Sequence, residues 1–357
     1  MSGKVYKVAI AGCGKRGKLY ADQFFKNPKF QVVGLTDPFK DAAVSASQMC
    51  GGAPVFDDAE SMLKNTNADV FSFCTPPSVR TSLIQLGVDN GVKLIAYEKP
   101  MADSMNEAIK IREIVNKAGV KTVQSHQRKY NVQFQKAKEV IDSGACGRIH
   151  TVYAQCGGWF MHMATHLADY MRFMINEADA EWVIGQVHGR EKLTDNHPSP
   201  DYAMALVQFK GGIRGIMETG YLCPDFPEVD YWWRKVRIGV QGTEGFAEAF
   251  VGGGWRSCTK SRGYEGSDEG TWDGDHEQAP YINDIARWLD GEIESHPCNG
   301  ESGYKDVEIA MAMLRSAAFR KKIDLPLGPI DKAELQLMNE IIPNEVPEKS
   351  VWDFLKK

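Results

Sequence analysis

Two stretches of the chain combine residue types and spacing that suit chemistry. Lys99 stands between Glu98 and Pro100, directly after an apolar run expected to form a strand. A lysine at the carboxyl end of such a strand can donate a hydrogen bond to negative charge that develops on a bound substrate. His162 and His166 are four residues apart, so a helix there would place both imidazoles on one face.

The histidine pair has three interpretations. Histidines at i and i+4 often bind zinc, but Met163 stands where the H-E-x-x-H motif has its glutamate, and no third ligand is evident. Both could instead be structural histidines whose ring nitrogens are satisfied inside the protein. We expect a substrate site without a metal.

A glycine-rich turn near the start predicts the cofactor. An apolar run ends in the pattern G-x-G-x-x-G, and a helix is expected to follow. In this setting the glycines allow a tight turn, close approach of a pyrophosphate, and close packing of the helix on the strand. The residues of this turn expected to bind the cofactor are Gly12, Cys13, Gly14, Lys15, Arg16 and Gly17.

The next strands sharpen the prediction to NAD. Asp37 ends the second strand, twenty residues after Gly17, where a carboxylate accepts the ribose hydroxyls and repels the extra phosphate of NADP. Ligands bind at the carboxyl ends of parallel strands, so the segments that follow the third and fourth strands should line the cofactor cleft. They contain Thr75, Pro76, Pro77, Glu98 and Lys99.

Hydrophobic patterning predicts two domains. Strands and helices alternate over residues 1–125, which indicates a doubly wound α/β sheet of about six strands, a Rossmann domain. Over 126–357 successive strands lack intervening helices, which favours an α+β domain with a mostly antiparallel sheet. Gly211 and Gly212 mark a hairpin. Two long loops, 223–234 and 252–278, are expected to be binding loops, lids or disordered segments. The apolar tail 343–357 is expected to be a docked strand or helix, or an oligomer contact.

Composition excludes several classes of protein. The 357 residues carry a net charge of −5 at a pI near 6.0, which gives no electrostatic reason to bind nucleic acid or an anionic membrane. No apolar run could span a bilayer. The eight cysteines form no C-x-x-C pair, which is typical of reduced thiols, so we expect a cytoplasmic protein.

These motifs together resemble the Gfo/Idh/MocA oxidoreductases, named for glucose–fructose oxidoreductase and inositol dehydrogenase. The resemblance rests on the glycine turn, Asp37, Thr75-Pro76-Pro77 and Glu98-Lys99-Pro100, and on later segments at 127–131, 144–149 and 325–327. It implies NAD(P)-dependent oxidation or reduction at a carbon of a sugar, cyclitol or related polyol. It also implies a second domain with a large open sheet, which is often used for oligomer contacts, and so a dimer or tetramer.

The resemblance also suggests roles for single residues. His166 matches the family's acid/base on the reacting hydroxyl, whereas His162 stands where the family pattern has an aspartate, which removes a fixed negative charge. Tyr130 and Tyr202 match positions near the cleft, and Tyr281 one near the nicotinamide. Trp159 precedes the histidine helix and could stack on a sugar ring, although the aromatic residues could equally belong to the core. Arg80 stands close to where many relatives carry a histidine.

Three functions remain open from the sequence. In an NAD-dependent dehydrogenase, His166 would take the hydroxyl proton, Lys99 would hold the developing alkoxide, and His162 would contact a neighbouring hydroxyl or orient His166. An NAD-recycling glycoside hydrolase of the same fold would oxidise, eliminate, add water and reduce again, without net turnover of nicotinamide. A nucleotide-binding regulator would keep the fold without chemistry.

Overall fold

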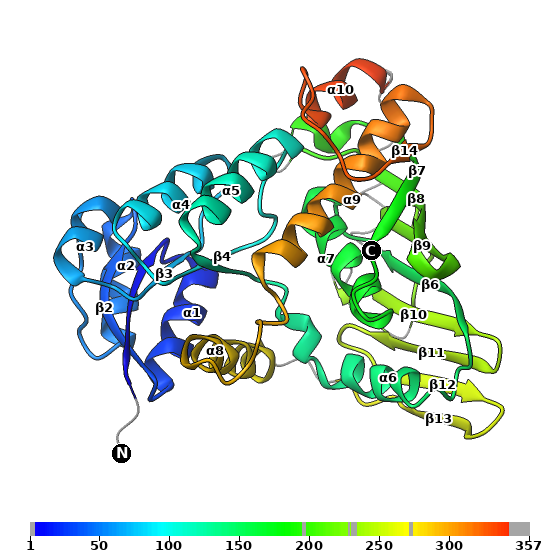
Figure 1. The fold of residues 1–357 in the computed structure, drawn as a ribbon, viewed down its shortest axis with the longest axis horizontal. Coiled ribbons are helices and arrows are strands. Elements are labelled where there is room, and N and C mark those ends of the chain that lie inside the picture. The colour runs from blue at the N-terminus through cyan, green and yellow to red at the C-terminus, as the bar shows by residue number, and fades with distance from the viewer. Residues whose placement is uncertain (1–3, 195–197, 228, 230–233, 271–273, 343–357) are drawn as a thin grey trace. The chain divides into compact units, whose positions relative to one another are not determined.

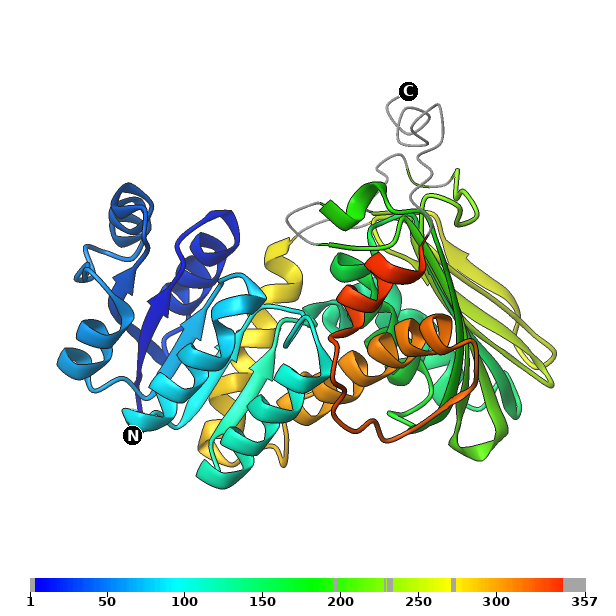
Figure 2. The ribbon, with the colours of Figure 1, turned by 90° about the horizontal axis from the view of Figure 1, so that it is seen from above.

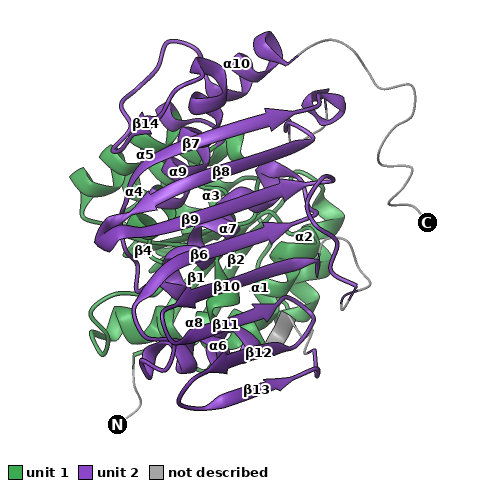
Figure 3. Ribbon diagram, turned by 90° about the vertical axis from the view of Figure 1, so that its right-hand side faces the viewer, with its two compact units in different colours: residues 1–102, 107–130, 273–304 green, residues 103–106, 131–272, 305–357 purple. Residues whose placement is uncertain are grey.

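The chain divides into two compact units, which Figure 3 distinguishes by colour. The computed structural model describes residues 4–194, 198–227, 229, 234–270 and 274–342. Unit 1 comprises residues 1–102, 107–130 and 273–304, and unit 2 comprises 103–106, 131–272 and 305–357.

This division differs from the expected single boundary between residues 125 and 126, because residues 273–304 return to unit 1. Their apolar side chains complete the core of that unit, where the buried residues from this segment are Tyr281, Ile282, Ile285, Ala286 and Cys298.

Unit 1 is a Rossmann-like parallel sheet flanked by helices (Figure 1). The strand order is β2-β1-β3-β4-β5. The strands are β1 (Tyr6–Ala11), β2 (Phe30–Thr36), β3 (Val70–Phe73), β4 (Leu94–Tyr97) and β5 (Lys121–Gln124). The helices are α1 (Lys15–Lys26), α2 (Lys40–Met49), α3 (Ala59–Thr66), α4 (Arg80–Asp89), α5 (Met105–Ala118) and α8 (Gly274–Asp290). The first two residues of α5 belong to unit 2.

The sheet has five strands, not the expected six. Beyond the outer strands, the described residues add only single bridges, Leu35 to Val55 at one edge and Val123 to Asn299 at the other. Every residue of β3 and β4 is buried. Strands of parallel sheets are covered on both faces, which explains why these segments are apolar in sequence except for Ser72.

Unit 2 contains a nine-stranded, mostly antiparallel sheet (Figure 3). The strand order is β13-β12-β11-β10-β6-β9-β8-β7-β14, and the one parallel pair in this order is β6 with β9. The strands are β6 (Ile149–Cys156), β7 (Ala180–His188), β8 (Tyr202–Phe209), β9 (Ile213–Gly220), β10 (Val236–Gly242), β11 (Gly245–Phe250), β12 (Trp255–Thr259), β13 (Gly263–Ser267) and β14 (Ile323–Asp324). The predicted hairpin joins β8 to β9, with positive φ at Gly211 and Gly212.

The expected long loop at 252–278 is wrong for much of its length. It contains the hairpin β12–β13, which extends the sheet, and the start of α8. The strands of an edge hairpin need only one apolar face, so this stretch can be rich in glycine and charge and still form a hairpin. Its composition is therefore similar to that of a loop. Tyr231, Trp232 and Trp233 of the other predicted loop lie outside the described residues, as does the tail 343–357.

Helices of unit 2 cover one face of its sheet. They are α6 (Val132–Asp142), α7 (Phe160–Met174), α9 (Gly300–Phe319, in unit 2 from residue 305) and α10 (Glu334–Ile341). Figure 2 shows α7 and α9 on the same side of this sheet. A Cβ atom at Gly215 of β9 would lie 2.4 Å from Met171 of α7, which identifies the covered face. No helix in the described part of the chain is long and apolar enough to cross a membrane.

Candidate active site

The glycine turn has the geometry of a dinucleotide cradle. Gly12 has a φ of +83°, and a Cβ atom there would lie 2.4 Å from the carbonyl oxygen of Cys74. A Cβ atom at Gly17 would lie 1.8 Å from the carbonyl oxygen of Gly12, so α1 can lie this close to the turn only with glycine. At Gly14, by contrast, no atom lies within 4 Å of a Cβ position. The turn is packed on its inner side and open at Gly14, which leaves room for a pyrophosphate at the start of α1.

Asp37 lies next to this turn. Its carboxylate accepts hydrogen bonds from the backbone amide of Cys13, at 2.6 Å, and from that of Phe39, at 2.8 Å. These bonds fix the carboxylate at the carboxyl end of β2, where the ribose of NAD is recognised in dinucleotide-binding folds. The predicted residues therefore fit NAD.

Arg16 links the glycine turn to the Glu98-Lys99 segment. Its guanidinium donates to the Glu98 carboxylate at 2.8 Å, and to Ser125 and Gln278 at 3.2 Å each. Burial alone would raise the pKa of Glu98, but the positive charges of Arg16 and Lys99 outweigh it and lower this pKa. Glu98 therefore stays ionised and holds Arg16 in the site.

Lys99 lies among these charges. Burial lowers the pKa of Lys99 to about 8, the negative charge of Glu98 opposes this shift, and Arg80, Arg16 and Arg128 add to it. A lysine with such a pKa exchanges a proton more easily near neutral pH than an exposed lysine does.

Arg80 is the site residue whose importance the sequence did not reveal. It donates to the carbonyl oxygens of Thr75, at 2.7 Å, and Lys99, at 3.3 Å. The structure therefore brings the glycine turn, Asp37, Thr75 and Lys99 to one edge of the unit 1 sheet, linked by hydrogen bonds. Pro76 and Pro77 continue that edge, and Pro77 begins a short 3-10 helix that leads into α4.

In unit 2, His162 and His166 lie on α7, one turn apart, as the spacing predicts. His166 is 7% exposed, and its ring stacks on Tyr170 with the ring centres 5.5 Å apart. His162 is half-buried near the start of the helix. Among the described residues, neither histidine belongs to a cluster of three or more side chains that could hold a metal ion.

Aromatic and basic side chains surround the start of α7. The ring of Trp159 lies 5.2 Å from that of His162, and the Lys192 ammonium lies 4.7 Å from the centre of the Trp159 ring. Asp201 holds the segment of Lys192 in place, because its carboxylate accepts the amide of Lys192 at 2.8 Å. This end of the helix offers the ring stacking and hydrogen bonding that suit a polar ring such as a sugar.

The predicted tyrosines are not gathered at the histidines. Tyr202 donates to Glu218 at 2.8 Å. Side chains alternate along β8 and β9, so this pair lies on the sheet face opposite α7, away from His162 and His166. The structure therefore does not bring Tyr202 together with the histidines, and its expected role in substrate binding stays a prediction.

Tyr130 and Tyr281 belong to the interior of unit 1. The Tyr130 hydroxyl donates to Asp284 at 2.7 Å, and its ring meets the edge of Tyr281. Tyr281 is fully buried between Tyr20 and His296. Tyr281 belongs to the core cluster of unit 1, and Tyr130 packs against it. This agrees with the alternative that the aromatic residues serve the core.

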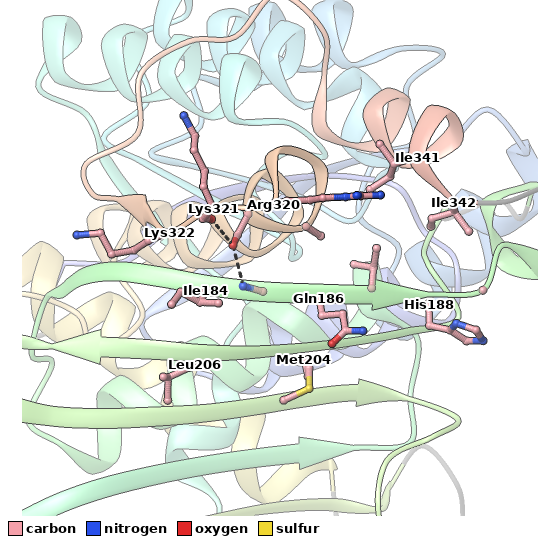
Figure 4. A pocket seen from close by; sticks show the side chains of 15 residues that line it. Ile184, Gln186, His188, Met204, Leu206, Arg320, Lys321, Lys322, Ile341 and Ile342 are labelled. Atoms are coloured by element: carbon pink, nitrogen blue, oxygen red, sulfur yellow. Dashed lines mark hydrogen bonds between the residues drawn. The ribbon is translucent and has the colours of Figure 1, made fainter.

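A pocket of about 1020 Å³ in unit 2 contains none of these residues (Figure 4). It lies along β7, next to the end of α9 and to Ile341 and Ile342. Arg320 extends toward Ile341, whereas Lys322 points the opposite way. The backbone amide of Gly185 donates to Ser316, which satisfies one group of the strand. The pocket is thus a feature of the sheet margin and not of the histidine helix.

Two family models match the chain. Residues 6–126 match the model described as the oxidoreductase family, NAD-binding Rossmann fold. Residues 153–248 match the model of the GFO/IDH/MocA C-terminal domain. The two matches together include the glycine turn, Lys99 and both histidines.

Individual proteins agree with these matches. The chain is 25% identical to scyllo-inositol 2-dehydrogenase (NAD(+)) of Bacillus subtilis, over 69% of this chain and 73% of that protein. It is 26% identical to inositol 2-dehydrogenase of Rubrobacter xylanophilus, over 88% and 92% of the two chains. The structure resembles that of levoglucosan dehydrogenase in complex with NADH and L-sorbose, with a TM-score of 0.78 at 17% identity, over 91% of this chain and all of that one.

Proposed function

The chain belongs to the Gfo/Idh/MocA family of NAD-binding oxidoreductases, and on this premise we propose that it oxidises or reduces a CH–OH carbon of a sugar, cyclitol or related polyol. The observation that carries the proposal is the continuous hydrogen-bonded edge in unit 1 that joins the NAD cradle to Lys99. Relatives named as inositol dehydrogenases support the substrate class.

Each active side chain has a defined role in this proposal. NAD, when bound, supplies the hydride acceptor or donor at its nicotinamide ring. In the oxidative direction His166 accepts the proton of the substrate hydroxyl, and Lys99 donates a hydrogen bond to the same oxygen as negative charge develops on it. His162 binds a neighbouring hydroxyl, and Trp159 packs against the ring of the substrate. The turn of α7 that carries His162 thus binds substrate, and the next turn, which carries His166, transfers the proton.

The outward face of the unit 2 sheet is proposed to form a homo-oligomer, as a dimer or tetramer. Ile184, Leu206 and Ile216 form a row across β7, β8 and β9, and their exposed fractions are 45%, 38% and 37%. Burying such a row against a second copy is favourable. Light scattering tests this: Leu206→Lys should give monomers, whereas Leu222→Lys, which alters an exposed leucine outside the row, should not. An unchanged mass for Leu206→Lys would contradict the proposed interface.

The substrate class is tested with purified protein, NAD and a panel of cyclitols, free sugars and aryl glycosides. Absorbance of NADH and release of the aryl group are followed in the same wells. A sustained rise in NADH with a free sugar or cyclitol supports the proposed dehydrogenase.

The other outcomes identify the alternatives. Release of the aryl group without accumulation of NADH would assign the chain to NAD-recycling glycoside hydrolases, with Lys99 and His166 serving a closed redox cycle. NAD binding without turnover across the whole panel would favour a non-catalytic regulator.

A further inference from the structure

Strand β7 is fully paired on one side and only partly paired on the other. β8 pairs with it from Ala180 to His188, whereas β14 pairs only with Trp182 and Val183. Among the residues that the structure describes, no strand covers the β14 side of β7 beyond Val183. An unpaired strand edge presents N–H and C=O groups with which a further segment can pair. The carboxyl half of β7 therefore offers an open edge.

The alternation of β7 identifies one amide at this open edge. The amide of Gly185 donates to the hydroxyl of Ser316 at 2.9 Å, so it faces away from β8. Along an antiparallel strand, every second residue directs its backbone groups to the same side. The amide of Val187 therefore also faces the open edge, whereas that of Ile184 faces Leu206 of β8.

The pocket of unit 2 lies along the same edge (Figure 4). Among its apolar lining residues, Ile184, Leu206 and Ile341 have exposed fractions of 45%, 38% and 39%. Covering such side chains is favourable. The edge and the pocket together suit an extended segment that pairs with the strand and places alternate side chains in the pocket.

The charges of the pocket favour an acidic occupant. Its lining contains the cations Arg320, Lys321 and Lys322 and no carboxylate. Lys322 pairs with Asp324, whereas Arg320 forms no ion pair with another described residue and extends toward Ile341 (Figure 4). A carboxylate near Arg320 would gain a charge-assisted hydrogen bond.

The chain itself supplies a segment of matching composition. Residues 343–357, which lie outside the described residues, follow Ile342, a lining residue whose carbonyl oxygen accepts from Arg190 at 2.8 Å. Arg190 comes two residues after β7, so the chain leaves Ile342 beside the open edge. The acidic residues of this segment are Glu345, Glu348 and Asp353, and its large apolar residues near the end are Val351, Trp352, Phe354 and Leu355.

The segment is also long enough to reach the whole open edge. Residues 343–350 can span at most about 27 Å when extended. The open edge from Gly185 to His188 is about 10 Å long at the usual rise of a strand.

We propose that residues 351–355 bind in this pocket and pair with the open edge of β7, with Trp352 and Phe354 against its apolar lining and Glu345 near Arg320. In an extended segment, Trp352 and Phe354 lie on the same side because they are two residues apart. The segment would close the edge of the sheet against pairing with other chains. This inference concerns unit 2 alone and does not depend on the proposed reaction.

Hydrogen exchange at the Val187 amide, resolved to single residues by mass spectrometry, tests the proposal. In the full chain this amide should exchange at least about 100-fold more slowly than in a chain that ends at Ile342. The amide of Ile184 faces β8 in both, so its slow exchange shows that the sheet of the shortened chain is folded. Similar rates at Val187 in the two chains would overturn the proposal.

Two variants of the full chain test which residues bind. Trp352→Ser combined with Phe354→Ser should speed exchange at Val187 as much as the truncation does. Val346→Ser alters an apolar residue of the same segment outside 351–355, and should leave this exchange slow. Slow exchange in the double variant, or fast exchange in Val346→Ser, would contradict binding through 351–355.

A charge exchange tests the acidic contact. Arg320→Glu should speed exchange at Val187 about tenfold, and the addition of Glu345→Arg should restore slow exchange, because the pair regains opposite charges. An Arg320→Glu variant that exchanges as slowly as wild type would contradict the proposed placement of Glu345.

Light scattering of the same samples distinguishes this contact from the proposed oligomer face, which shares Ile184 and Leu206 with the pocket. The mass of the assembly should be the same with and without residues 343–357, and exchange at Val187 should not depend on protein concentration. A lower mass after truncation, or faster exchange on dilution, would show that the segment contacts a second copy and would overturn binding within one chain.

Discussion

The carboxyl edge of unit 1 and the start of α7 in unit 2 are built from different interactions. In unit 1, charged side chains are fixed by hydrogen bonds to backbone and to each other, as Arg16 with Glu98 and Arg80 with Thr75 and Lys99 show. In unit 2, an aromatic ring lies beside each histidine, Trp159 beside His162 and Tyr170 beside His166. Charged groups held in fixed positions favour one arrangement of charge on a ligand, whereas contacts with aromatic rings accept ligands of varied shape.

Loss of a reacting group should cause the largest effect. Lys99→Met and His166→Asn should each lower kcat by about 10³-fold, because each removes hydrogen bonding or proton transfer to the reacting oxygen. NAD affinity, measured by calorimetry, should remain within a few-fold of wild type for His166→Asn. Normal hydride transfer in Lys99→Met, measured in single-turnover experiments, would contradict the assigned role.

The second largest effect is expected from adding a methyl group to a glycine in each region, because the two glycines differ in how closely the backbone packs around them. Gly17→Ala should destabilise the protein by about 3 kcal/mol, because its Cβ would collide with a backbone oxygen at 1.8 Å. Gly158→Ala, next to α7, should cost much less, since its Cβ would meet the flexible side chain of Met163 at 2.6 Å. Urea unfolding of both variants gives the comparison. Equal losses would show that the two turns are equally rigid.

Gly14→Ala is the control within the glycine turn. Its backbone is extended and the Cβ position is open, so stability should stay close to that of wild type. A methyl group there would meet the pyrophosphate instead, so NAD affinity should fall.

The core of unit 1 should also respond to acid. Burial lowers the pKa of His296 to about 4, so this histidine is neutral in the folded protein. The unfolded chain binds its proton near pH 6.5, and stability should therefore fall as the pH drops from 6.5 to 4, by about 3 kcal/mol. His296→Gln should flatten this part of the stability curve, measured by urea unfolding at each pH. An equally steep curve in the variant would show that other groups dominate.

The smallest effect is expected at His162. His162→Asn should raise KM about tenfold with little change in kcat, because this residue binds a neighbouring hydroxyl and does not transfer the proton. Steady-state kinetics on the best substrate of the panel measure both constants. A fall in kcat as large as that of His166→Asn would place His162 in proton transfer and remove the distinction between the two turns of α7.

Much of the local geometry of the candidate site was predictable because its signals are local. The glycine spacing, the aspartate at the end of β2 and the lysine after β4 depend on where strands end, which hydrophobic patterning shows well. The pair His162 and His166 follows from the periodicity of a helix. The predicted NAD-binding fold and the mostly antiparallel second sheet are both confirmed.

The sequence could not show where distant segments meet. Side chains alternate along β8, but only the packing of α7 reveals which face of the sheet is covered, and so on which face Tyr202 lies. Residues 273–304 follow the second sheet in sequence, yet their apolar side chains complete the core of unit 1. The hairpin β12–β13 has a composition that is also typical of loops.

The sequence by itself determined the cofactor cradle, the strand-and-helix order and the local placement of the lysine and histidines that we propose to react, because these depend on short-range geometry. The tertiary structure decided the electrical environment of Lys99, since Arg16, Arg80 and Arg128 come from separate segments of the chain. Charge–charge energies depend on distance and burial, which no spacing in the sequence supplies.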